Sequence, residues 1–84
     1  MTTVEEIERV CREMCELLGM DWEDFLATLR VLRRSSDWSK IGFRAGGIEL
    51  ELSNDSWKGL NLRVTRQEQG VRTIREYDLS YLRI

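Results

Sequence analysis

The region from Lys40 to Arg66 alternates between apolar and polar residues with a period of two. Such alternation predicts β-strands that each bury one face. The apolar positions of the three strands are Ile41, Phe43 and Ala45, then Ile48, Leu50 and Leu52, then Leu60, Leu62 and Val64. The pattern predicts a three-stranded antiparallel meander with all of these residues on the same side.

Two consecutive glycines at 46–47 predict a two-residue hairpin turn between the first two strands, because glycine tolerates the positive φ that such turns require. This turn fixes the pairing of the two strands. Phe43 is expected opposite Leu50 on the apolar face. Arg44 is expected opposite Glu49 on the polar face.

The second and third strands are connected by a polar stretch, 54–59, which we interpret as a loop. If this whole stretch is a loop and the apolar residues of both strands face the same side, Leu50 is predicted to lie opposite Leu62. The same register predicts Arg63 opposite Glu49. Glu49 is therefore expected to lie between two arginines on the polar face.

A fourth strand is predicted over 71–77, after a turn at 67–70. Val71, Thr73 and Tyr77 share one side of it with Arg75, and Ile74 lies on the other side with two charged residues. Faces this mixed favour an edge strand. The tail that follows, 78–84, carries enough apolar side chains to pack, either as a closing strand or as a short helical turn.

The first part of the chain predicts two helices. Thr3 begins a Thr-Val-Glu-Glu sequence with the spacing of a capping box, and Gly19 is suited to a left-handed helix end. Asp21 is expected to cap a second helix over 22–34. A connection this short predicts a helical hairpin over 3–34.

These elements predict an α+β fold, in which an N-terminal αα-hairpin packs on one face of a four-stranded antiparallel meander sheet, in two layers. The 84 residues are expected to form a single small domain, made of the helical hairpin 3–34, the antiparallel sheet 40–77 and the packed tail 78–84. A domain of this size has marginal stability, to which self-association could add.

The side chains available for chemistry are few. The sequence has no histidine, which removes the commonest general base and the base of a serine or cysteine triad. Cys11 and Cys15 lie one helical turn apart on the buried stripe, and two thiols fall short of a four-ligand metal site. We therefore expect no enzyme activity, no cofactor and no metal, and two reduced core cysteines.

The sequence has no apolar run long enough to cross a membrane, and its acidic start differs from a signal peptide. A cytoplasmic location without membrane association is therefore expected. The charge is polarised: residues 1–29 carry eight acidic and two basic residues, whereas residues 30–84 carry seven acidic and eleven basic ones. Such a distribution suits electrostatic recognition of a partner.

The sequence is compatible with three functions. The first is a non-catalytic protein-binding module of the adaptor, regulator or inhibitor type, which acts through its charge-polarised surface. The second is weak binding of RNA or single-stranded DNA through an arginine-rich outer sheet face with nearby aromatic residues. A small enzyme is the third, and a homo-oligomer is compatible with each. The candidate partner contacts are Val31, Arg44, Trp57, Lys58, Arg63, Arg66, Arg72 and Arg75.

Overall fold

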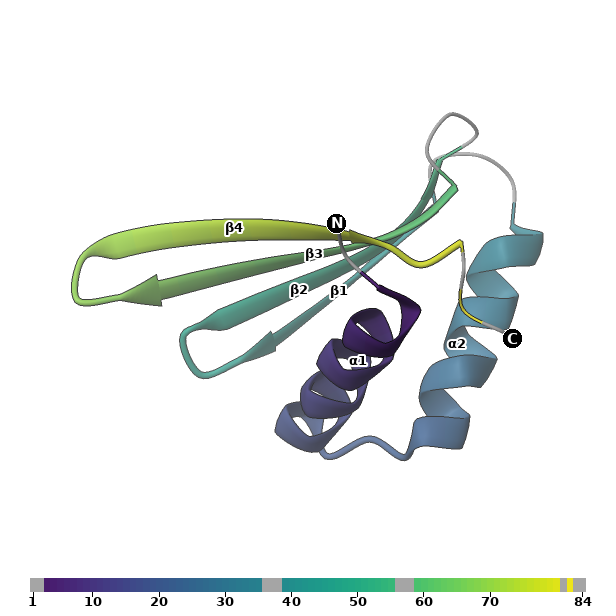
Figure 1. Cartoon of the computed structure of the whole chain (residues 1–84), viewed down its shortest axis with the longest axis horizontal. Helices are drawn as coiled ribbons and strands as arrows, with labels where there is room; N and C mark the ends of the chain where they lie inside the picture. Colours follow the sequence, from purple (N-terminus) through teal and green to yellow (C-terminus); the bar gives the residue numbers. More distant parts are fainter. Residues whose placement is uncertain (1–2, 36–38, 56–58, 81, 83–84) are drawn as a thin grey trace.

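Two helices lie on one face of a four-stranded antiparallel sheet in the computed structural model of this chain (Figure 1). The predicted α+β two-layer fold is thus confirmed. The structure describes residues 3–35, 39–55, 59–80 and 82. The elements are α1 (Val4–Leu18), α2 (Trp22–Arg34), β1 (Ser39–Ala45), β2 (Ile48–Asp55), β3 (Gly59–Glu68) and β4 (Val71–Asp78). The strands follow one another in chain order, so β1 and β4 are the two edges.

The ends of the helices follow local signals in the sequence. At the start of α1, the Thr3 hydroxyl accepts a hydrogen bond from the Glu6 amide at 3.2 Å. α1 ends at Gly19, whose φ of 67° is left-handed. The side-chain cap predicted for Asp21 is absent, and the Asp21 backbone carbonyl instead accepts from the Phe25 amide at 3.0 Å. Neither helix is long and apolar enough to span a membrane, and the described residues contain no other helix.

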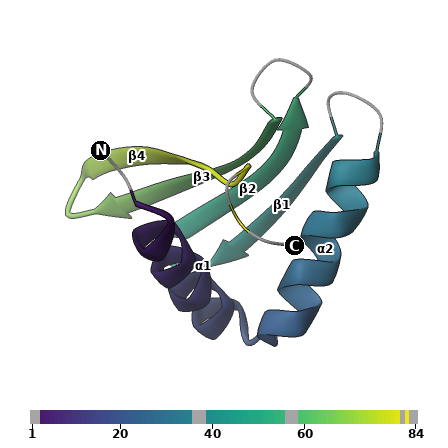
Figure 2. The same cartoon turned by 45° about the vertical axis from the view of Figure 1, so that its right-hand side comes forward.

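The two helices diverge from the short connection that joins them, and the segment that follows β4 passes between their far ends (Figures 1 and 2). Leu79 and Leu82 are both buried there. The Leu79 amide donates to the Leu60 carbonyl at 2.9 Å, which ties the end of β4 to the start of β3. These contacts close the core between the divergent helices.

The pairing of β1 with β2 matches the prediction, with Phe43 opposite Leu50 and Arg44 opposite Glu49. The predicted pairing of β2 with β3 is wrong by two residues. Leu50 lies opposite Val64. Because side chains alternate with a period of two, this even shift keeps every residue on its predicted face and changes only its neighbours.

The shift arises because part of the predicted loop 54–59 is strand. Asn54 pairs opposite Leu60, and Asp55 pairs opposite Gly59. The Asn54 side-chain amide donates to the Leu32 carbonyl at the end of α2 at 2.8 Å. That bond satisfies a polar side chain on the helix side of the sheet, so the strand continues past its last apolar residue.

The helices cover only part of the sheet. Leu52 and Leu62, each 1% exposed, belong to the covered half, where the core lies. Beyond it, the β3–β4 hairpin extends past α1 (Figure 1). We call the exposed helix-side residues of this extension the overhang, and they are Arg66, Glu68, Val71, Thr73 and Arg75.

Candidate functional site

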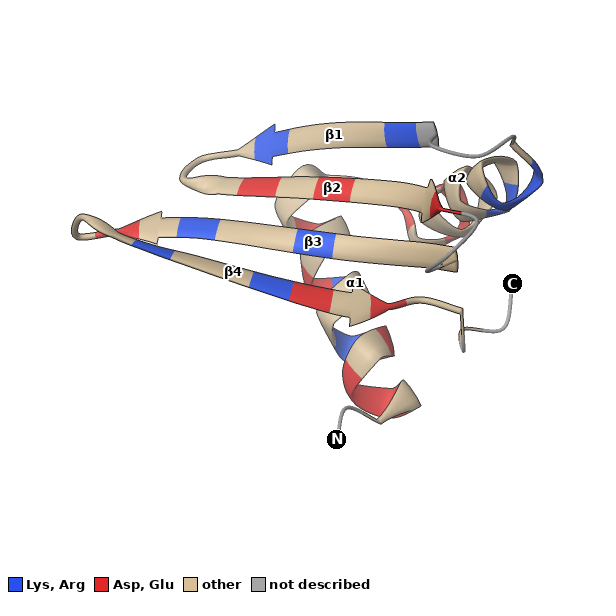
Figure 3. Ribbon diagram, turned by 90° about the horizontal axis from the view of Figure 1, so that it is seen from above, with Lys and Arg blue, Asp and Glu red and all other residues tan. Residues whose placement is uncertain are grey.

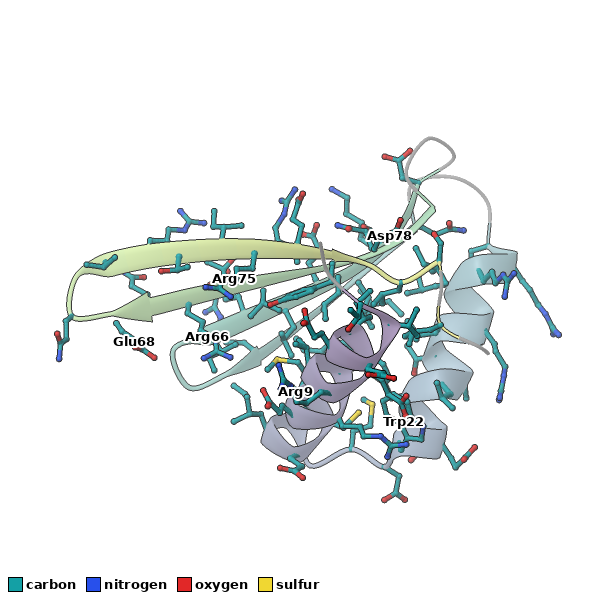
Figure 4. The ribbon with its side chains drawn as sticks, in the orientation of Figure 1. Arg9, Trp22, Arg66, Glu68, Arg75 and Asp78 are labelled. Carbon is teal, nitrogen blue, oxygen red and sulfur yellow. The ribbon has the colours of Figure 1, made fainter. Side chains whose placement is uncertain are left out.

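The overhang and α1 enclose a groove of about 730 Å³ on the helix side of the sheet (Figure 4). Its sheet wall consists of the overhang with Val64, Gln69 and Tyr77. α1 contributes Glu6, Arg9, Val10 and Glu13. The groove therefore combines charged side chains of both signs with aliphatic ones.

The strand pairing positions the two sheet arginines of the groove. Arg66 follows Val64 by two residues and therefore shares its face. Arg75 lies directly opposite Val64, and Thr73 lies directly opposite Arg66. Arg66 and Arg75 are thus diagonal neighbours, a separation that long side chains can bridge.

The helix wall follows from the spacing along α1. Glu6, Arg9 and Glu13 are separated by three and four residues, which places them along one side of a helix. Val10 lies next to them and is half-buried. In Figure 4, Arg9 lies below the labelled Arg66 and Arg75, so α1 brings a third guanidinium to the same groove.

The three groove arginines have no ion-pair partner in the described part of the chain. Among the described residues, no carboxylate lies within 4.0 Å of a basic nitrogen of Arg9, Arg66 or Arg75. None of the three side chains donates a hydrogen bond within that part of the chain either. Their donors are available to a ligand.

The opposite face of the sheet has a different charge arrangement. Arg44 pairs with Glu49 at 2.9 Å. Arg63 pairs with Glu76 at 2.8 Å and lies 4.0 Å from Glu51. Figure 3 shows the acidic positions of β2 between basic positions of β1 and β3.

These pairs correct the predicted triplet on the outer face. Because β2 and β3 are shifted by two residues, Arg63 faces Glu51 and not Glu49. An arginine therefore lies between two glutamates, where a glutamate between two arginines was predicted. Charge neutralisation across neighbouring strands explains the arrangement without any recognition role.

The structure divides the predicted contact residues among separate surfaces. Val31 is 64% exposed on α2. The outer sheet face carries Arg44, Arg63 and Arg72. Arg66 and Arg75 lie on the opposite face, in the groove, and so do not belong to an arginine-rich outer face. Trp57 and Lys58 lie outside the described residues.

Sequence reasoning missed the contribution of α1 to the groove. Arg9 and Glu13 lie on the charged side of α1, and such a charge pattern is typical of a helix face exposed to solvent. Their proximity to the sheet depends on where α1 crosses the strands, which no local pattern specifies. A signal for the groove does exist in β3, where the apolar face of Val64 continues as Arg66 and Glu68.

The two cysteines lie in the core and not in the groove. Both are free thiols and buried. Burial, with the neighbouring Cys15 and Glu8, raises the pKa of the Cys11 thiol to about 12. Burial also raises the pKa of Cys15. Protonated thiols of this kind are poor nucleophiles.

Comparisons with protein-family models, curated proteins and solved structures found no match.

Proposed function

We propose that this chain is a non-catalytic protein-binding module, whose ligand is an acidic segment of another protein with aliphatic side chains, held in the groove. One observation carries the proposal. The outer-face arginines Arg44 and Arg63 are neutralised by glutamates, whereas the groove arginines Arg9, Arg66 and Arg75 have no carboxylate partner among the described residues.

The chemistry of the groove fits a peptide segment. Arginine forms bidentate, charge-assisted hydrogen bonds with carboxylates, so acidic side chains of a ligand suit Arg66 and Arg75. Val10 and Val71 provide apolar surface beside them. A ligand that alternates acidic and aliphatic residues can use both kinds of contact at once.

Nucleic acid is the weaker alternative. A phosphate backbone needs a continuous positive track. The groove interrupts such a track with Glu6, Glu13 and Glu68. On the outer face, phosphates would compete with carboxylates that already hold Arg44 and Arg63.

The test is a selection of displayed random peptides against the whole chain, followed by binding measurements on the enriched sequences. We expect enrichment of peptides in which Asp or Glu alternates with aliphatic residues. The double variant Arg66→Glu, Arg75→Glu should weaken their binding by about tenfold or more, because two attractive contacts become repulsive.

The matched control is Arg30→Glu, Arg33→Glu, which changes the net charge equally on exposed positions of α2. It should leave binding within about twofold. Equal losses in both variants would show a nonspecific charge effect and contradict the groove. Single-stranded RNA is titrated in parallel, and tight binding that falls steeply between ~50 and ~200 mM salt would favour the nucleic-acid alternative.

A further inference from the structure

β4 is an open edge of the sheet. In the described part of the chain it pairs with β3 alone. It also exposes one branched apolar side chain on each face, Val71 at 64% and Ile74 at 52%. An exposed edge strand presents unpaired backbone groups that another strand can use.

The turn before β4 determines which backbone groups are unpaired. Gln69 and Gly70 have φ of 50° and 78°, the signature of a two-residue hairpin with positive φ at both turn residues. The flanking pair, Glu68 and Val71, is therefore hydrogen-bonded, and every second pair after it is too. The N–H and C=O groups of the intervening residues point to the open edge, and these residues are Arg72, Ile74, Glu76 and Asp78.

We propose that β4 pairs antiparallel with β4 of a second copy of this chain, about a twofold axis at Ile74, so that the two sheets become one. In this register Ile74 meets its own copy at the axis. Arg72 lies opposite Glu76 of the second copy, and the symmetry produces this pair twice. All three residues direct their backbone groups to the shared edge.

The helix side of β4 is complementary in the same register. Val71 lies opposite Tyr77 of the second copy, which pairs an exposed aliphatic side chain with a half-buried aromatic one. Thr73 lies opposite Arg75 and introduces no like charge. Aromatic and β-branched cross-strand pairs are among the stabilising combinations in antiparallel sheets.

Neighbouring registers lack this complementarity. An axis at Arg72, Arg75 or Glu76 places a charge against its own copy. An axis at Thr73 places Arg72 opposite Ile74 and loses both ion pairs. Among these registers, only the one with its axis at Ile74 pairs apolar residues with each other and also pairs opposite charges.

The other edge of the sheet is protected against the same pairing. β1 also ends in a two-residue hairpin turn, so Lys40, Gly42 and Arg44 direct their backbone groups outward. Pairing β1 with its own copy about Gly42 would place Lys40 opposite Arg44, twice. Like charges at an edge are a common device against association, and the register proposed for β4 brings none of them opposite one another.

The pairing would also join the two grooves. Val71, Thr73, Arg75 and Tyr77 all line the groove. Since these residues pair with one another across the axis, the sheet walls of both grooves become continuous in the dimer. The inference concerns self-association alone and does not depend on the identity of any groove ligand.

The first experiment measures the mass of the chain by sedimentation equilibrium and native mass spectrometry, from low micromolar to near-millimolar concentration. We expect a concentration-dependent dimer. Arg72→Glu and Glu76→Arg should each weaken it by about tenfold or more, since each substitution creates two repulsive pairs. An equimolar mixture of the two variants should restore a heterodimer, because each new charge then meets an opposite one.

The second experiment reads the register directly by oxidation. Ile74→Cys places two thiols at the axis, where hydrogen-bonded partners have Cα atoms about 5.5 Å apart, within disulfide reach. The control Arg72→Cys lies on the same strand and face, but its copy is four residues away along the strand, or about 13 Å.

We expect rapid cross-linking of Ile74→Cys and little of Arg72→Cys. Circular dichroism confirms that each variant is folded. A chain that stays monomeric throughout the concentration range would overturn the proposal. So would preferential cross-linking of Arg72→Cys, or a dimer insensitive to both charge reversals.

Discussion

On the helix side of the sheet, the helices cover one half and leave the other half exposed, although the same strands run through both halves. In β3, Leu62 is 1% exposed, and four residues later Arg66 is exposed in the overhang. β3 has ten residues, or about 33 Å, whereas the fifteen residues of α1 span about 22 Å. Alternation therefore determines which face a residue occupies, but helix length and crossing position determine whether that face is buried.

The largest expected effect lies in the covered half. Leu62→Ala should lower the free energy of unfolding by ~2–5 kcal/mol, because it removes buried methyl groups and leaves a cavity. In a domain this small, such a loss can abolish folding. Urea denaturation followed by tryptophan fluorescence measures it. A loss below ~1 kcal/mol would mean that the site repacks or that the core lies elsewhere.

A matched substitution compares the two halves directly. Val64 is 4% exposed in the covered half and Val71 is 64% exposed in the overhang. Val→Thr keeps the β-branched shape and adds a hydroxyl. Val64→Thr should cost ~1–2 kcal/mol because its hydroxyl is buried, and Val71→Thr should change stability by less than ~0.5 kcal/mol.

Both variants are measured by urea denaturation at low protein concentration, so that self-association does not contribute. Equal costs would show that the overhang is as well covered as the core. The proposed difference in burial between the two halves of the sheet would then be wrong.

Much of the covered half could be predicted from the sequence. The double glycine at 46–47 fixed the β1–β2 register, since turn length and apolar pattern agree there. The prediction of the β2–β3 register was wrong because Asn54, Asp55 and Gly59 are residue types that are common in loops. Asn54 remains in the strand through its hydrogen bond to α2, a contact between residues 22 positions apart. No local pattern contains that information.

The groove was predictable only in part. Arg66 and Arg75 were recognised as candidate contacts from their charge, but they were not combined into one site on the helix side. The alternation from Val64 places both on the helix side. Arg9 could not have been found, because its place in the groove depends on the packing of α1 against the sheet.

The thiol of Cys11 in the covered half makes stability sensitive to alkaline pH. Its pKa is about 12 in the folded chain, against an ordinary value of 9.0. Above the ordinary value, the unfolded thiol loses its proton while the folded one retains it, so stability falls as pH rises from about 9 to 12. The loss should reach about 1.4 kcal/mol near pH 10.

The measurement is the free energy of unfolding at several pH values under reducing conditions. Cys11→Ala should have a shallower decline than the unsubstituted chain above the ordinary thiol pKa, whatever its absolute stability. The titrating groups that do not interact with Cys11 are shared by the two chains and cancel in the difference. Parallel declines would show that Cys11 ionises normally in the folded state.

The smallest expected effects distinguish the two faces of the β3–β4 hairpin. Arg63 on the outer face contacts Glu51 and Glu76, whereas Arg75 in the overhang contacts no carboxylate among the described residues. Arg63→Gln should lower stability by ~0.5–1 kcal/mol at low ionic strength, and salt should reduce this loss. Arg75→Gln should change stability by less than ~0.5 kcal/mol at any salt concentration. Urea denaturation of both variants at low and high salt measures these differences. A salt-dependent cost for Arg75→Gln would mean that its guanidinium already has a partner within the chain, and the proposed ligand binding would then lose one of its three arginine contacts.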